Sequence, residues 1–169
     1  NPFGIDLLIF GNSFLNFLTG EPVTEGGTVE VSDDGTNFFV VPGGEADSTF
    51  PTLGYLDLSD PFQTTPGSVV SDFTFPVDPA VNIAGFTLAQ IVTAYNGSGG
   101  GSPVDLAAVG LSQISFVRIT NPVGSGNTPE IDALADVAPM PEPVNALPTL
   151  LGLLGLCMTF SCRSRVREI

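Results

Sequence analysis

Several residue types that usually carry chemistry are missing from this chain of 169 residues. It contains no histidine and no tryptophan, and its four basic residues are all arginine. Both cysteines, Cys157 and Cys162, lie near the C-terminus, so the first 140 residues contain no thiol. The chain therefore lacks an imidazole base and the usual zinc and iron ligands, and no disulfide holds its larger part together. Without tryptophan, a sugar-stacking surface has to be built from phenylalanine or tyrosine.

Positive charge is scarce and unevenly placed. Arg118 lies within the first 140 residues, and the other three arginines lie among the last seven. The formal net charge is −14, and of the 18 carboxylates only Glu142 and Glu168 lie beyond residue 140. So acidic a surface repels nucleic acid and anionic lipid headgroups, and we expect no nucleic-acid partner. It suits a secreted protein that must stay soluble, or a protein that binds divalent cations.

The C-terminus carries three features in a fixed order. A Pro-Glu-Pro triplet is followed by the uncharged segment Ala146–Cys162 and then by the arginine cluster. As a helix rising about 1.5 Å per residue, the segment is about 25 Å long, near the short end of what spans a bilayer. It lacks the polar face of an amphipathic core helix, and arginines favour the cytoplasmic side. We therefore expect a transmembrane helix at 146–162, a basic cytoplasmic tail at 163–169, and residues 1–138 across the membrane.

This order of triplet, apolar helix and arginines resembles the PEP-CTERM sorting signal of Gram-negative bacteria. In that family the triplet is recognised by exosortase, a membrane transpeptidase, and the helix with its arginines is a transient anchor. The resemblance implies that the linker at 139–145 holds the recognition motif and that the protein is exported. It would be anchored in the inner membrane before processing, and would then be at the cell surface or extracellular. The sorting residues are Pro141, Glu142, Pro143, Arg163, Arg165 and Arg167.

Export also requires an N-terminal signal, and this chain begins at Asn1 without one. We therefore expect the sequence to be truncated at its N-terminus.

Short alternating or apolar runs between many glycines and prolines predict an all-β fold for residues 1–138. The Asp34-Gly35 pair predicts a hairpin whose second strand ends at Pro42-Gly43-Gly44. Apolar residues at helical spacing predict a short helix over 87–95, and the glycine-rich segment Asn96–Ser102 predicts a flexible loop. Residues 104–111 are compatible with a helical turn or a strand. Strands are expected at 5–10, 28–32, 37–41, 114–119 and 130–137.

The hairpin sequence VEVSDDGTNFF, Val29–Phe39, is similar to a strand pair of discoidin-like, galactose-binding-type jelly rolls. It is also similar to a hairpin of bacterial secreted surface proteins, in which it stands in a fixed order of strands. Here the corresponding order extends from residue 5 to residue 137, with departures at Gly11 and Val104. The resemblances imply a jelly-roll β-sandwich, and the sorting signal implies bacteria that make exopolysaccharide and form biofilms. We therefore expect a non-enzymatic matrix or adhesion component, with extracellular polysaccharide as a possible partner.

Two carboxylates about 5–10 Å apart can hydrolyse a glycosidic bond. A chain this acidic offers such pairs by chance, and without histidine or lysine it has no ordinary means of activating serine. We expect no enzyme. A carboxylate-based glycosidase or a calcium-dependent carbohydrate-binding module stays open as the alternative. The candidate acids are Asp57, Asp60, Asp72, Asp78, Asp105, Glu130 and Asp132.

Calcium takes six to eight oxygen ligands, which loops rich in aspartate, asparagine and glycine supply. By analogy with the similar secreted proteins, a structural Ca²⁺ ion is expected near Asp105, Glu130 and Asp132. The alternative is that these acids are solvated or cap turns. Arg118 is expected to form an ion pair with Glu130 or Asp132, and the alternative is a contact with a ligand.

Overall fold

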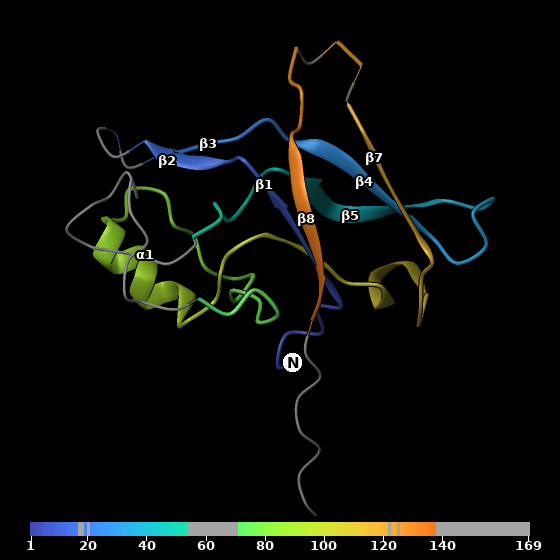
Figure 1. The fold of residues 1–169 in the computed structure, drawn as a ribbon, viewed down its shortest axis with the longest axis horizontal. Helices are drawn as coiled ribbons and strands as arrows, with labels where there is room; N and C mark the ends of the chain where they lie inside the picture. The colour runs from blue at the N-terminus through green and yellow to red at the C-terminus, as the bar shows by residue number, and fades with distance from the viewer. Residues whose placement is uncertain (17–18, 20, 54–70, 122, 125, 138–169) are drawn as a thin grey trace, which may run out of the picture. The chain divides into compact units, whose positions relative to one another are not determined.

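The computed structural model describes residues 1–16, 19, 21–53, 71–121, 123–124 and 126–137, all within the unit Asn1–Pro139. These residues form mostly β structure, with three small antiparallel sheets and one short helix (Figure 1). This confirms the all-β expectation at that level. The elements in chain order are β1 (Leu7–Gly11), β2 (Phe14–Asn16), β3 (Glu21–Val23), β4 (Gly27–Ser32), β5 (Phe39–Ala46), α1 (Leu88–Tyr95), β6 (Ser102–Val104), the 3₁₀ turn η1 (Ala107–Val109), β7 (Phe116–Thr120) and β8 (Ile131–Asp136).

The first sheet has the order β6-β1-β8, so β1 is its central strand. Leu8, Ile9 and Phe10 are all buried, because both faces of this strand are covered. A strand buried on both faces has a continuous apolar sequence rather than an alternating one. Strands were expected at 5–10 and 130–137, and β1 and β8 confirm both within a few residues.

The second sheet has the order β5-β4-β7 and contains the expected hairpin. Gly35 has a φ of 72°, which glycine adopts without a steric penalty, and the carboxylate of Asp34 accepts hydrogen bonds from the backbone N–H groups of Thr36 and Asn37. The expected end of the second strand at residues 42–44 is wrong. Strand β5 continues to Ala46, because a register shift opposite Thr28 and Glu30 accommodates the extra residues.

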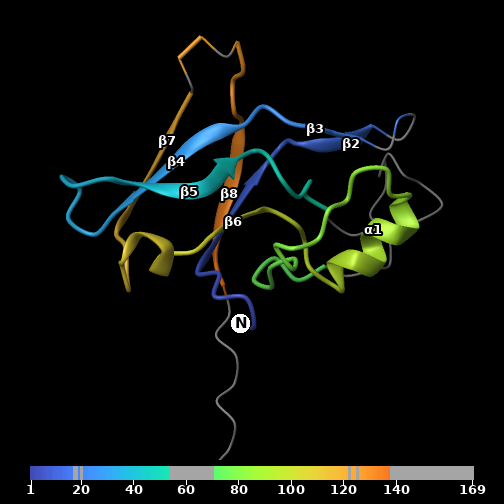
Figure 2. The same ribbon diagram turned by 180° about the vertical axis from the view of Figure 1, so that it is seen from behind.

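The two three-stranded sheets share one hydrophobic core. Ile9 and Val104 from the first sheet pack with Val29, Val31 and Val41 from the second. Both views show β4 and β5 crossing β1 and β8 (Figures 1 and 2). We call this cluster the sheet core. It is the cluster that alternation in β4 predicts, since Val29 and Val31 point inward while Glu30 points outward.

A second cluster surrounds α1, and we call it the helix-side core. It contains Leu15, Phe50, Leu53, Val77, Ile83, Ile91 and Tyr95. The helix begins with a capping box, in which the Thr87 side chain and backbone exchange hydrogen bonds with Gln90. It ends at Asn96, whose φ of 48° is left-handed. Ile91 and Tyr95 are buried, so the helix expected over 87–95 is confirmed.

The glycine-rich segment after α1 is not the exposed flexible loop that its composition predicts. Ser98, Gly99, Gly100 and Gly101 are all buried. The N–H of Leu53 donates to the carbonyl of Gly99, and the N–H of Gly101 donates to that of Phe50. A Cβ on Gly100 would lie 2.3 Å from the carbonyl oxygen of Pro51, so a larger residue cannot occupy this position without a shift. The glycines allow close backbone packing rather than chain flexibility.

The region at residues 104–111 contains both alternatives, since β6 ends at Val104 and η1 follows at Ala107–Val109. Strand β7 confirms the strand expected at 114–119. The β2–β3 hairpin was not predicted. Within the residues that the structure describes, no helix is long and apolar enough to cross a membrane. The span expected at 146–162 lies outside those residues.

Candidate functional site

Some of the expected functional residues lie outside the described part of the chain. These are Asp57 and Asp60 of the candidate acids and all six residues of the sorting signal, Pro141, Glu142, Pro143, Arg163, Arg165 and Arg167. The remaining candidates lie on the two three-stranded sheets and on the segments between their strands.

Arg118 forms an ion pair with Glu30, so the expected pairing with Glu130 or Asp132 is wrong. The Nε and Nη2 atoms of Arg118 lie 2.6 Å from the two carboxylate oxygens of Glu30. Strand β7 pairs with β4, and the register places Arg118 directly opposite Glu30. Glu130 and Asp132 instead lie at the edge of the other sheet, where β8 pairs with β1. The partner of Arg118 was expected on the next strand in the chain, β8, but β7 pairs with β4.

The guanidinium of Arg118 is held by a second contact. Its Cζ atom lies 3.9 Å from the ring centroid of Phe38, which is a cation–π geometry. The hydrogen bonds with Arg118 lower the pKa of Glu30 and raise the pKa of Arg118. The pair is thus charged at neutral pH, and two fixed contacts restrict the guanidinium although its side chain is 46% exposed.

The ion pair lies on the outer face of the second sheet. Cross-strand partners share a face, so Val40 lies beside Glu30, and Phe116 lies two residues from Arg118 on the same side. Val40 is 56% exposed and Phe116 is 48% exposed. We name this surface the β4–β7 face, and it consists of Thr28, Glu30, Phe38, Val40, Glu45, Phe116, Arg118 and Thr120.

The three residues expected to bind calcium are not brought together. Asp105 follows β6, and its carboxylate accepts a hydrogen bond from the N–H of Ala107. Glu130 precedes β8, and its carboxylate accepts a hydrogen bond from the side chain of Asn12. Pairing with β1 places Val104 opposite Leu7 but Ile131 opposite Gly11, so Asp105 and Glu130 lie near opposite ends of β1.

Glu130 and the exposed Asp132 are neighbours at one of those ends. The described residues contain no group of three or more possible side-chain ligands close enough to share a metal ion. Calcium binding stays a prediction.

A buried aspartate that the sequence did not single out lies near Glu130. Asp47 is 1% exposed and has a left-handed φ of 55°. Its two carboxylate oxygens accept hydrogen bonds from the backbone N–H groups of Ser13, at 2.7 Å, and Glu130, at 3.3 Å. Asp47 therefore connects the segments after β1, after β5 and before β8. Its sequence context, Ala46-Asp47-Ser48, looks like an ordinary turn and gave no signal.

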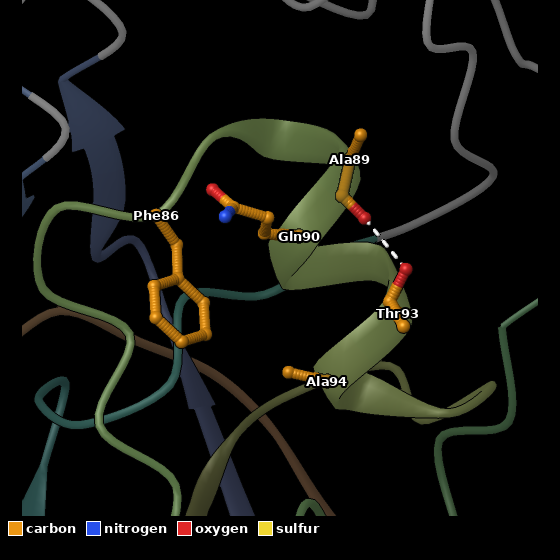
Figure 3. Close-up of a pocket in the computed structure, with 5 residues that line it drawn as sticks. All are labelled: Phe86, Ala89, Gln90, Thr93 and Ala94. Carbon is orange, nitrogen blue, oxygen red and sulfur yellow. Dashed lines mark hydrogen bonds between the residues drawn. The ribbon is translucent and has the colours of Figure 1, made fainter.

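One side of α1 carries a shallow pocket of about 430 Å³ (Figure 3). It is lined by Phe86, Ala89, Gln90, Thr93 and Ala94. The Thr93 hydroxyl donates to the Ala89 carbonyl, and the Gln90 side-chain oxygen accepts from the backbone of Thr87. These lining residues include no titratable side chain, so they offer neither an acid nor a base for catalysis.

Comparison with protein-family models, with curated proteins and with solved structures found no match. Two features of the chain bear on its function: the sequence order of the Pro-Glu-Pro triplet, the uncharged segment and the arginines near the C-terminus, and the β4–β7 face.

Proposed function

We propose that this protein is an exported component of an extracellular matrix or adhesive surface, delivered by a PEP-CTERM-type sorting signal. The observation that carries the proposal is the order Pro141-Glu142-Pro143, then the uncharged segment Ala146–Cys162, then three arginines. Each feature alone is common, but together they specify a direction across a membrane. Exosortase is the proposed processing partner, and the membrane is a partner only before cleavage.

The proposed body of the protein is a jelly-roll β-sandwich. Its support is the sheet core, in which Ile9 and Val104 from one antiparallel sheet pack against Val29, Val31 and Val41 from another. Two sheets with a common core are the arrangement of sandwich domains. The finer galactose-binding-like topology remains part of the proposal.

The proposed role is non-enzymatic. Residues 1–140 contain no histidine, lysine or cysteine, so that sequence has no imidazole, amine or thiol side chain to act as a base or nucleophile or to activate a serine. The net charge of −14 keeps such a protein soluble outside the cell and away from nucleic acid. Extracellular polysaccharide is the proposed partner, because a biofilm matrix consists largely of it.

A calcium-dependent role is the second proposal, and the proximity of Glu130 and Asp132 at one end of β8 favours it. Exposed carboxylates together with backbone carbonyls suit calcium. A rise in melting temperature of the full chain at millimolar CaCl₂, lost in a Glu130→Gln/Asp132→Asn variant, would support this role. Calorimetry without heat, together with an unchanged melting temperature, would end it.

The sorting proposal is tested by the mass of the exported protein. The full chain, preceded by an export signal, is produced in a Gram-negative host with exosortase and in a matched host lacking it. We expect the first host to release a form cut near Pro141, and the second to retain the intact chain. A Glu142→Ala variant should remain uncut in both hosts, because the recognition triplet is altered. An intact mass in the exosortase host, or an N-terminal reporter active only in the cytosol, would refute the proposal.

A further inference from the structure

We propose that the β4–β7 face binds a neutral polysaccharide chain. The inference rests on the proposed function, because a matrix component meets such polymers outside the cell. It adds a binding surface, a ligand class and the residues that contact the ligand.

The first support is the chemistry of the face. Phe116 is 48% exposed and supplies an apolar ring of the kind that stacks on the C–H face of a sugar. Beside it on the same strand, Arg118 presents a guanidinium that Glu30 and Phe38 hold in place. Arginine has five N–H donors, so donors remain for sugar hydroxyls after Glu30 takes two.

The second support is charge. Outside its C-terminal tail the chain has one cation, Arg118, and Glu30 neutralises it. The centre of the β4–β7 face around this pair therefore carries no net charge, while Glu45, the cross-strand partner of Thr28, lies at one end of the face and Asp34 lies in the turn between β4 and β5. An anionic polymer would be repelled by these acids, whereas a neutral glycan would not.

The third support is size. With strands about 4.8 Å apart and about 3.3 Å per residue, the face extends about 15 Å in each direction. Stable protein interfaces need about 800 Å² from each partner, several times what a face of this size offers. The face is therefore too small to hold a second copy of the chain, and it fits a few rings of an extended glycan.

Pre-organisation completes the argument. The ion pair and the cation–π contact already fix Arg118, so binding costs little side-chain entropy there. A flat and open face gives weak binding at each site, and a matrix polymer compensates by engaging many copies at once.

The test uses the full chain kept in a mild detergent, so it does not depend on export or cleavage. Soluble glucan, galactan and xylan oligosaccharides are the neutral probes, and polygalacturonate is the anionic comparator. We expect millimolar or tighter binding to at least one neutral probe and none to polygalacturonate. Phe116→Ala should weaken binding about fivefold, because a stacked aromatic ring contributes about 1 kcal/mol. Arg118→Lys should weaken it several-fold, because lysine keeps the charge but loses the fork of donors.

Phe14→Ala is the matched control, since Phe14 is 55% exposed on β2, outside the β4–β7 face. It should bind like the unaltered chain, and circular dichroism establishes that each variant is folded. Three results would overturn the proposal: no binding to any neutral probe, a preference for polygalacturonate, or equal losses in the Phe116→Ala and Phe14→Ala variants. Failure of sorting would instead appear as an uncut exported chain and would leave these measurements unchanged.

Discussion

The sheet core and the helix-side core are stabilised in different ways. The sheet core is formed by paired strands, in which Val29 and Val31 point inward at every second residue. The helix-side core joins α1 to irregular segments around Phe50, Leu53 and Val77. Its backbone is held by isolated hydrogen bonds outside regular strands and by close contacts at the glycines. Substitutions that preserve hydrophobicity should therefore be tolerated in the sheet core, whereas the helix-side core should depend on individual residues.

The largest expected effect is that of Gly100→Ala in the helix-side core. Both Gly97 and Gly100 have left-handed φ angles, 90° and 83°, so alanine at either position costs about 1–2 kcal/mol. Only at Gly100 would the new Cβ meet a backbone atom, the carbonyl oxygen of Pro51 at 2.3 Å. We expect Gly100→Ala to lower the free energy of unfolding by at least about 3 kcal/mol. Gly97→Ala is the control, and urea denaturation measures the loss of unfolding free energy in both variants. Equal losses would show that the close contact with Pro51 is unimportant.

Asp47→Ala tests the connection between the two sheets and should have the next largest effect. The change removes the acceptor of two backbone N–H groups, those of Ser13 and Glu130. Leaving such groups without an acceptor in a buried site costs about 3 kcal/mol in total. Asp47→Asn keeps one carbonyl oxygen and tolerates the left-handed φ, so its loss should be about half as large. If both variants unfold at the same urea concentration as the unaltered chain, Asp47 does not hold the sheets together.

Tyr95→Phe should have a moderate effect, confined to the helix-side core. The buried Tyr95 hydroxyl donates to the carbonyl of Pro51 at 3.0 Å, and its loss should cost about 1–2 kcal/mol. Thr93→Val is the control on the same helix, because its hydrogen bond to Ala89 is exposed, and it should change stability by less than about 0.5 kcal/mol. Thermal unfolding compares the two.

Burial also raises the pKa of Tyr95. Because the pKa of Tyr95 is higher in the folded chain, the unfolded chain loses this proton at a lower pH. The free energy of unfolding should therefore fall as the pH rises above the ordinary pKa of tyrosine. The unaltered chain should therefore be more sensitive to alkaline pH than the Tyr95→Phe variant. Parallel losses of melting temperature above pH 10 would contradict this.

Glu30→Gln on the β4–β7 face should have the smallest effect, and that effect should depend on pH. Its hydrogen bonds with Arg118 lower the pKa of Glu30 from 4.5. The stabilisation by the pair is present above that value and is lost as the pH falls through the lowered pKa. The difference in melting temperature between the unaltered chain and the variant should be small at pH 7 and should vanish in strong acid. A difference that persists at pH 2 would show that the ion pair is not its cause.

The difference between the sheet core and the helix-side core also explains which parts of the fold could be predicted from the sequence. Strands β1, β4, β7 and β8 follow from apolar runs and alternation, and α1 follows from the helical spacing of its apolar residues. Such local patterns identify elements but not their partners. The pairing of β7 with β4 is a long-range choice, and for this reason the partner of Arg118 was expected among the wrong acids.

The close packing of the irregular segments around α1 was missed for a related reason. Glycine-rich composition is typical both of flexible loops and of close backbone packing, and only the tertiary contacts of Gly100 separate the two. Asp47 and the β2–β3 hairpin gave no periodic signal, because they are short and depend on contacts with distant residues. The proposed sorting signal needs no tertiary contact, because its features are consecutive in the chain.

The ion pair of Arg118 also has a consequence for resistance to digestion. Trypsin-like proteases cut after lysine or arginine, and up to residue 137 the only such position is the bond between Arg118 and Ile119. That bond lies inside β7, hydrogen-bonded to β4, and the arginine that a protease would need in its specificity pocket is bound by Glu30 and Phe38. The folded part up to residue 137 should therefore survive secreted tryptic enzymes, and a cut within it should become possible only when β7 separates from β4.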